Sequence, residues 1–145
     1  MKATELMMGD WVIVRRPSSR REKVRVKSVI GNGTIEAKTR DGLVALGELV
    51  VEPIPLTAEI LEKNGFEELM SEGWESAAKF GRVPEPTGVW QYGFGQFDSV
   101  SYLPKRNFLS VKFMEGYTAD IANIKYVHEL QHALRLCGVG KEIIL

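Results

Sequence analysis

This chain has little cysteine, little histidine and no long apolar run. Its 145 residues include one cysteine, Cys137, which excludes a disulfide within the chain and a four-cysteine zinc site. No stretch approaches the roughly 18 apolar residues that a membrane-spanning helix needs, and the first residues contain no apolar run of signal-peptide length. From these absences we expect a cytoplasmic protein with no membrane partner.

The chain also carries no net charge, because 19 Lys and Arg residues are matched by 19 Asp and Glu residues. This balance argues against a protein whose whole surface is built for nucleic acid or anionic lipid. The charge is uneven along the chain, however. Residues 1–50 hold ten basic and six acidic side chains, a balance of +4, and the remaining 95 residues carry nine and thirteen, a balance of −4. We therefore expect any polyanionic partner to bind the N-terminal part.

The N-terminal part reads as a small unit of β-strands. A short apolar run at residues 11–14 predicts a buried strand, and in "KVRVKSV" the apolar Val24 and Val26 alternate with cations, which is typical of a half-buried strand. The glycines within residues 31–33 and the pair Asp41-Gly42 predict turns before two further strands, in "TIEAK" and "LVALGEL". Four short strands with short connections favour a small SH3-like β-barrel over residues 1–55.

The next segment, residues 56–87, is predicted to contain short helices and a linker. Thr57 is a suitable N-cap for a short helix that ends at Gly65. Just before it, Pro53 and Pro55 exclude a central strand or helix interior, and Pro84 and Pro86 predict a loop over residues 82–88. Residues 66–81 are ambiguous, because Gly73 interrupts the helical spacing.

Residues 88–145 are predicted to form an antiparallel sheet followed by a C-terminal amphipathic helix. Strand-like runs occur in "VWQYGF", "SVSYL" and "FLSVKF", the last two as a hairpin. A helix is expected over part of residues 120–137, with Asp120 and Asn123 as competing N-caps and Gly138 just beyond its end, before a short edge strand in "KEIIL". The expected fold class is therefore α+β, with strands predominating.

The C-terminal stretch "YVHELQHALRLCG" contains His128, Glu129 and His132 in the HExxH spacing of zinc hydrolases. This spacing places two imidazoles on one helix face, where they can bind one zinc ion while the glutamate acts as general base. Such a site needs a third protein ligand, and Glu142 is the only acidic side chain after His132. Little of the chain is left to supply that ligand.

The helical projection of the same stretch favours a structural role. At about 100° per residue, Val127, Leu130 and Leu134 form one apolar stripe that we expect to be buried, while His128 and His132 fall on a side that we expect to be solvated. We therefore predict no metal site and no catalytic residue here. A zinc-dependent hydrolase that uses the HELQH motif is the alternative.

A basic run near the N-terminus is the candidate binding site. Phosphate groups of nucleic acid can be held by a basic loop and strand face of a small barrel. An exposed hairpin whose charges maintain solubility and protect a sheet edge is the competing interpretation. The run contains no cluster of aromatic side chains, which argues against specific single-strand recognition. The candidate residues are Arg15, Arg16, Arg20, Arg21, Lys23, Arg25 and Lys27.

Three blocks of the sequence are distinctive in combination: "LMMGDWV", "VEPIPLTAEILEKNGF" and "IKYVHELQHALRLCG". Together they resemble a group of small uncharacterised bacterial proteins associated with prophage and mobile-element genes. The resemblance touches both ends and the middle of the chain. It implies that Gln and Asn can stand at the positions of Glu129 and His132, and hence that HExxH is incidental to the role the group shares.

These patterns together predict a non-enzymatic binding or adaptor module that uses no cofactor. No P-loop, nucleophile elbow or complete dinucleotide fingerprint occurs in the sequence. The expected partners are another protein and, weakly, nucleic acid through the basic N-terminal unit.

Overall fold

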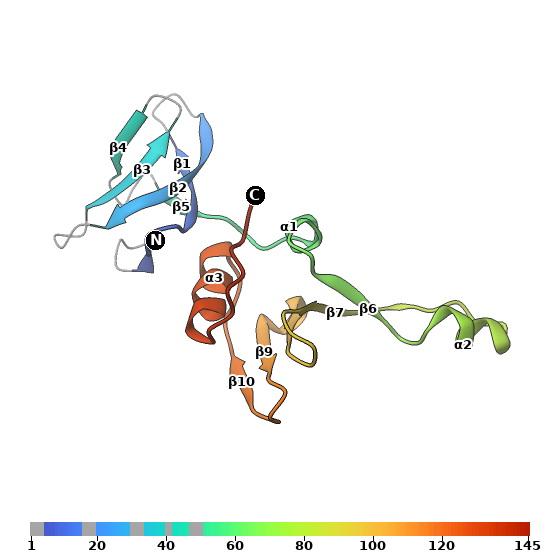
Figure 1. Ribbon diagram of the computed structural model, residues 1–145. Coiled ribbons are helices and arrows are strands. Elements are labelled where there is room, and N and C mark those ends of the chain that lie inside the picture. Colours follow the sequence, from blue (N-terminus) through green and yellow to red (C-terminus); the bar gives the residue numbers. More distant parts are fainter. Residues whose placement is uncertain (1–4, 16–19, 30–33, 40–41, 47–50) are drawn as a thin grey trace. The chain divides into compact units, whose positions relative to one another are not determined.

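The computed structural model describes residues 5–15, 20–29, 34–39, 42–46 and 51–145. These described residues form two antiparallel sheets of five strands each and a few short helices, so the predicted α+β class is confirmed. Figure 1 shows how the elements are arranged along the chain. The chain divides into two compact units. The first contains residues 1–56, 126–132 and 145, and the second contains residues 57–125 and 133–144. Within the described ranges, none of the helices has the length and apolar character needed to cross a membrane.

The first sheet belongs to the first unit and has the strand order β4-β3-β2-β1-β5. Strands β1 to β4 follow one another as a meander, and β5 returns to pair with β1. Pro53 lies in the edge strand β5, where its missing N–H removes no hydrogen bond from the centre of the sheet. The strands are β1 (Trp11–Arg15), β2 (Arg21–Val29), β3 (Ile35–Thr39), β4 (Gly42–Leu46) and β5 (Val51–Pro53).

Among the described residues, no pairing joins β4 to β5 and closes this sheet. The SH3-like barrel expected over residues 1–55 therefore stays a prediction. The expected loop at residues 16–19, the turn at residues 31–33 and the expected strand end at residues 47–49 lie outside the described residues.

Alternation of apolar and polar side chains builds the core of the first unit. Val24 and Val26 are 2% and 1% exposed, as their spacing predicts, and Val12, opposite Val24, is completely buried. Each buried valine or isoleucine stabilises the fold by about 1.5–3 kcal/mol, so the cluster fixes which face of each strand points outward. The cluster consists of Leu6, Val12, Val14, Val24, Val26, Ile35, Ala37 and Val51.

The second sheet belongs to the second unit and has the strand order β10-β9-β8-β7-β6. Strands β8 and β9 form the predicted hairpin, with the 3-10 helix η3 (Pro104–Arg106) between them. Tyr102 of β8 is 3% exposed, and its hydroxyl donates a hydrogen bond of 2.7 Å to the carbonyl of Ile124. The strands are β6 (Glu67–Met70), β7 (Pro86–Gly93), β8 (Ser99–Leu103), β9 (Phe108–Lys112) and β10 (Thr118–Ile121).

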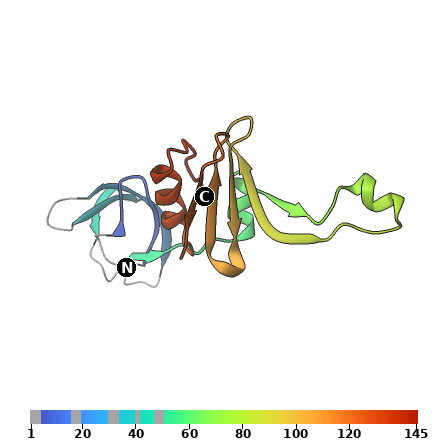
Figure 2. The same ribbon diagram turned by 90° about the horizontal axis from the view of Figure 1, so that it is seen from below.

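Residues 66–81, ambiguous in the sequence, contain strand β6 and the short helix α2 (Trp74–Lys79). Figures 1 and 2 both show α2 at the end of a long excursion between β6 and β7, away from β8 and β9. The excursion exposes large apolar side chains, including Trp74 at 65% and Val83 at 72%. Its own contacts are mostly polar: the guanidinium of Arg82 donates hydrogen bonds of 3.0 and 2.9 Å to the carboxylate of Glu72.

Helix α1 (Ala58–Lys63) confirms the capping prediction at Thr57. The Ile60 amide donates to the Thr57 hydroxyl at 3.3 Å. At the other end of α1, the buried Asn64 side chain donates to the Ile144 carbonyl and accepts from the Ile144 amide, both at 2.8 Å. The edge strand predicted for residues 141–145 is therefore wrong: a side-chain clamp, and not a strand partner, holds this segment.

Helix α3 (Val127–Leu136) is the predicted C-terminal helix, and its first residue lies beyond both predicted N-caps. Asp120 belongs to strand β10, where its carboxylate accepts a hydrogen bond of 2.7 Å from Ser110. Asn123 has a positive φ of 64° and does not cap the helix. Gly138 ends α3 with a φ of 72°, as expected for the residue after a helix C-terminus.

Candidate functional site

The outer face of the first sheet gathers most of the basic side chains expected from the sequence. Lys23 and Arg25 of β2 alternate with buried valines, so both point away from the core. The strand registers place Trp11 of β1 and Lys38 of β3 directly opposite Arg25, on its two sides. Because directly opposite residues share a sheet face, Trp11, Arg25 and Lys38 form one row across three strands.

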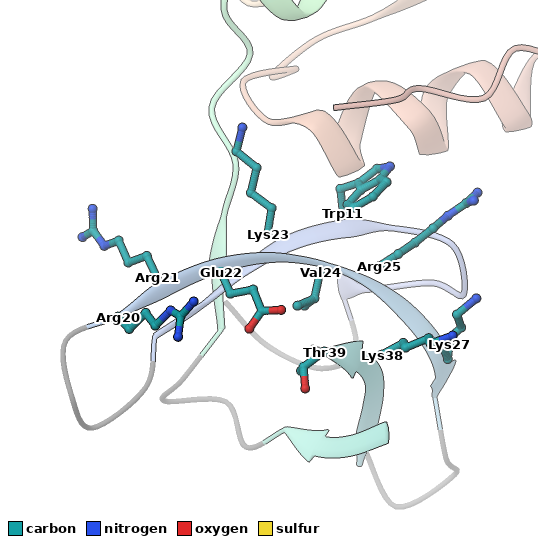
Figure 3. A pocket seen from close by; sticks show the side chains of 10 residues that line it. All are labelled: Trp11, Arg20, Arg21, Glu22, Lys23, Val24, Arg25, Lys27, Lys38 and Thr39. Atoms are coloured by element: carbon teal, nitrogen blue, oxygen red, sulfur yellow. The ribbon is translucent and has the colours of Figure 1, made fainter. Parts of the chain in front are cut away.

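A groove of about 660 Å³ runs along these strands. Figure 3 shows the Trp11, Lys23 and Arg25 side chains on one side of β1 and β2, and the Glu22 and Val24 side chains on the other. The volume lies within the range of about 300–1,000 Å³ that is usual for ligand sites. Among the described residues, the charged side chains that line the groove are Glu22 and six cations, an excess of positive charge that favours anions. The six cations are Arg20, Arg21, Lys23, Arg25, Lys27 and Lys38.

Two cross-strand pairs on this face place a cation opposite a cation. Arg15 lies opposite Arg21 in the β1–β2 register, and Arg25 lies opposite Lys38 in the β2–β3 register. Like charges in directly opposite positions destabilise a sheet. The first pair is relieved by Glu52 of β5, whose carboxylate forms an ion pair with Arg15 and lies 3.5 Å from the Arg21 guanidinium.

The structure brings together five of the seven residues expected to contact nucleic acid. Arg15 lies beside them on the same face and is paired with Glu52, whereas Arg16 lies outside the described residues. Trp11 and Lys38 were not among the expected residues, because the register of three strands, which is not local in sequence, brings them to the groove. The five expected residues that line the groove are Arg20, Arg21, Lys23, Arg25 and Lys27.

The side chains of the HExxH motif have other partners. The Glu129 carboxylate accepts a hydrogen bond of 3.1 Å from the backbone amide of Tyr126. A glutamate in the first turn that accepts a hydrogen bond from the amide just before the helix satisfies a donor that would otherwise lack an intrahelical partner. Glu129 therefore caps α3 in this structure.

His132 contacts a buried carboxylate from the start of the chain. Its Nε2 lies 2.7 Å from Oδ2 of Asp10, and the same carboxylate oxygen accepts a hydrogen bond of 2.7 Å from the Met7 amide. The Asp10 side chain has no exposed surface, and the His132 side chain is 26% exposed. This contact fastens the segment before β1 to the first turns of α3, within the first unit.

His128 is 5% exposed, so the expectation of a solvated histidine face is wrong. Its ring stacks on Tyr126 with 5.9 Å between ring centroids, and meets the edge of His132 at 5.7 Å. The expected stripe is confirmed, since Val127, Leu130 and Leu134 are completely buried. Helix α3 is thus buried over more of its circumference than one apolar stripe.

Burial lowers the pKa of the His128 imidazole below its ordinary value of 6.5, against the opposing effect of Glu129 and Asp10. Its Nδ1 has no hydrogen-bond partner among the described residues. A cavity of about 370 Å³ adjoins this region and is lined by Glu5, Met7, His128, Glu129 and His132.

The donor set around this cavity does not match a zinc site. Within the described residues, no group of three or more His, Cys, Asp and Glu side chains is arranged to hold a metal ion. The Nε2 atom of His132 is occupied by Asp10, and the Glu129 carboxylate by the Tyr126 amide. His132 and Glu129, a ligand and the base of the hydrolase alternative, thus have structural partners here.

Comparisons with family models, with curated proteins and with solved structures found no match for this chain.

Proposed function

We propose that this protein is a non-enzymatic binding module whose N-terminal unit holds the phosphate backbone of nucleic acid in the groove along β1, β2 and β3. The observation that carries the proposal is the strand register, which sets Arg15 opposite Arg21 and Arg25 opposite Lys38, a cation facing a cation in each pair. Such a pair costs stability in the unbound sheet unless an acid offsets it, as Glu52 does for Arg15 and Arg21, and a bound polyanion supplies the same relief.

The charges around the groove support the same partner. Six cations and one acid line a groove large enough for a nucleotide-sized ligand. Ion pairs between exposed side chains stabilise a protein by only about 0–1 kcal/mol. Phosphate can therefore replace Glu52 as the partner of Arg15 and Arg21 at a small cost in free energy.

The test measures the binding of a fluorescently labelled oligonucleotide of about 12 nucleotides, with fluorescence anisotropy as the readout, at about 50 mM salt. A groove variant removes four exposed cations and should bind at least about tenfold more weakly, because each phosphate contact contributes to affinity at low salt. The groove variant carries Arg20→Gln, Lys23→Gln, Lys27→Gln and Lys38→Gln.

A control variant removes the same charge from exposed positions of the second unit. It should bind like the parent protein, because its loss of net charge is identical but lies outside the groove. Equal weakening of both variants would mean that net charge alone drives binding and would refute a site in the groove. The control variant carries Lys63→Gln, Lys79→Gln, Lys105→Gln and Lys112→Gln.

We also propose that residues 1–55 form an SH3-like barrel. The meander of β1 to β4, with β5 returning to the other side of β1, supports this topology. Backbone contacts between β4 and β5 in nuclear magnetic resonance spectra would establish closure. We further propose a cytoplasmic location, a protein partner and kinship with the prophage-associated bacterial group. A nucleic-acid-binding module is compatible with each of these three proposals.

A further inference from the structure

We infer that the groove selects single-stranded over double-stranded nucleic acid, with one base stacked on Trp11 while the cations of β2 and β3 hold the adjacent phosphates. This inference rests on the proposed function of the groove. The inference adds the class of nucleic acid that binds, and it names Trp11 as the side chain that distinguishes single strands from duplexes.

Trp11 stands at one end of a row of side chains that lie opposite one another across the sheet. Its register partner is Arg25, whose partner on the next strand is Lys38, and Lys38 in turn lies opposite Leu43 of β4. Neighbouring strands are about 4.8 Å apart, so Trp11 and Lys38 stand about 10 Å from each other along this row. An aromatic side chain and then two cations therefore follow one another across three strands, one strand spacing apart.

Trp11 is half-buried, which fixes the ring while leaving part of it exposed beside the groove it lines. Figure 3 shows the ring on the same side of β1 and β2 as Lys23 and Arg25. At the other end of the row, Leu43 is 62% exposed and adds apolar surface.

Every nucleobase has a flat π face, and stacking of a base on an aromatic side chain strengthens binding by about 5- to 150-fold for a single base, with little dependence on sequence. In a duplex those faces are covered by neighbouring base pairs, so a protein reaches only base edges and phosphates. A groove that combines cations with one aromatic ring therefore gains more from a single strand.

The basic segment by itself contains no aromatic cluster, and for that reason the sequence argued against single-strand recognition. Strand β1 supplies the missing ring, because hairpin pairing sets Trp11 beside β2. Residues 15–27 therefore supply the cations of the proposed site but not its aromatic ring.

The experiment compares three probes of equal length with the unmodified protein: an oligo(dT) of about 12 nucleotides, an abasic strand with the same phosphates, and a duplex. We expect oligo(dT) to bind at least fivefold more tightly than the abasic strand, and more tightly than the duplex at the same salt concentration. An oligo(rU) of the same length should behave like oligo(dT), because the stacking face does not depend on the sugar.

Variants then assign the preference to Trp11. Trp11→Ala should remove the preference for oligo(dT) over the abasic strand, and Trp11→Phe, which retains an aromatic ring, should keep most of it. Circular dichroism establishes that each variant is folded, and Trp74→Ala, a change at an exposed tryptophan of the second unit, should keep the full preference.

The outcomes separate the two proposals. Salt-dependent binding of all three probes with equal affinity would overturn the selection of single strands and leave the phosphate-binding function intact. Binding of none of the probes would overturn both. A preference for oligo(dT) that persists in folded Trp11→Ala would overturn the role of Trp11.

Discussion

The Asp10 carboxylate and the His132 imidazole meet at 2.7 Å between Oδ2 and Nε2, although 122 positions separate them in the chain. The carboxylate is completely buried and also accepts the Met7 amide. This contact explains why His132 belongs to the structure of the first unit: it ties the segment that leads into β1 to α3. The strand that carries Trp11 begins immediately after Asp10.

Asp10→Ala should destabilise the protein by about 2–4 kcal/mol, because it leaves the Met7 amide and the His132 imidazole without their partner. Urea denaturation measures the change. The control is Asp120→Ala, which removes a carboxylate with an exposed hydrogen bond to Ser110 and should cost less than about 1 kcal/mol. Equal losses of unfolding free energy in the two variants would show that the buried Asp10 contact stabilises the protein no more than the exposed Asp120 contact does.

Stability should fall as the pH drops below about 6.5, because His128 is held neutral by burial. The unfolded chain takes up a proton near the ordinary pKa of 6.5, whereas the folded chain does so only at its lowered pKa. The stabilisation is therefore complete above pH 6.5 and declines between that value and the lowered pKa, by at most about 1.4 kcal/mol per pH unit.

The variant His128→Phe isolates this effect, since phenylalanine can still stack on Tyr126 and does not titrate. Denaturation midpoints measured from pH 7.5 to about pH 5 should decline less in the variant than in the parent protein. Both proteins retain the charged neighbours of position 128, which are His132, Glu5, Asp10 and Glu129. The difference between the two pH profiles therefore reports on His128. Parallel pH profiles would contradict the prediction.

Protein purified without chelator should contain well below one zinc ion per chain, because the partners of His132 and Glu129 compete with metal binding. Elemental analysis by mass spectrometry is the measurement. Stoichiometric zinc that disappears in His132→Ala would revive the hydrolase alternative. Zinc retained in that variant would indicate a site elsewhere in the chain.

Glu52→Gln should tighten oligonucleotide binding by about two- to fivefold, because the carboxylate competes with phosphate for Arg15 and Arg21. The matched control is Glu62→Gln, which removes an exposed carboxylate from the second unit and should leave affinity unchanged. Fluorescence anisotropy at constant salt compares them. Weaker binding by the Glu52 variant would show that the ion pairs organise the site and do not compete for it.

Local patterns in the sequence predicted those elements whose chemistry is local. The alternation around Val24 and Val26 gave strand β2 and its buried face, and Gly138 marked the end of α3 through its left-handed conformation. Thr57 capped α1 as expected. In each of these cases, neighbouring residues alone determine the geometry.

The features that were missed depend on contacts between distant segments. The run Glu67 to Met70 consists of good helix formers, yet it pairs with β7 and becomes strand β6. Burial of His128 could not be read from a helical projection, which identifies one apolar stripe and not packing around a wider arc. Trp11 was not predicted as a site residue, because the register between β1 and β2, which is not local in sequence, sets it beside Arg25.

The salt dependence of oligonucleotide binding is the most direct test of a nucleic-acid site in the groove. With the parent protein, the logarithm of the binding constant should fall with the logarithm of salt concentration with a slope of about −2 to −4, as expected when a single strand releases counterions at several phosphate contacts. The groove variant, which lacks the cations at positions 20, 23, 27 and 38, should have a slope of no more than about half that of the parent, and the control variant should match the parent. Absence of binding at about 50 mM salt, or an identical slope in all three proteins, would contradict a nucleic-acid site in this groove.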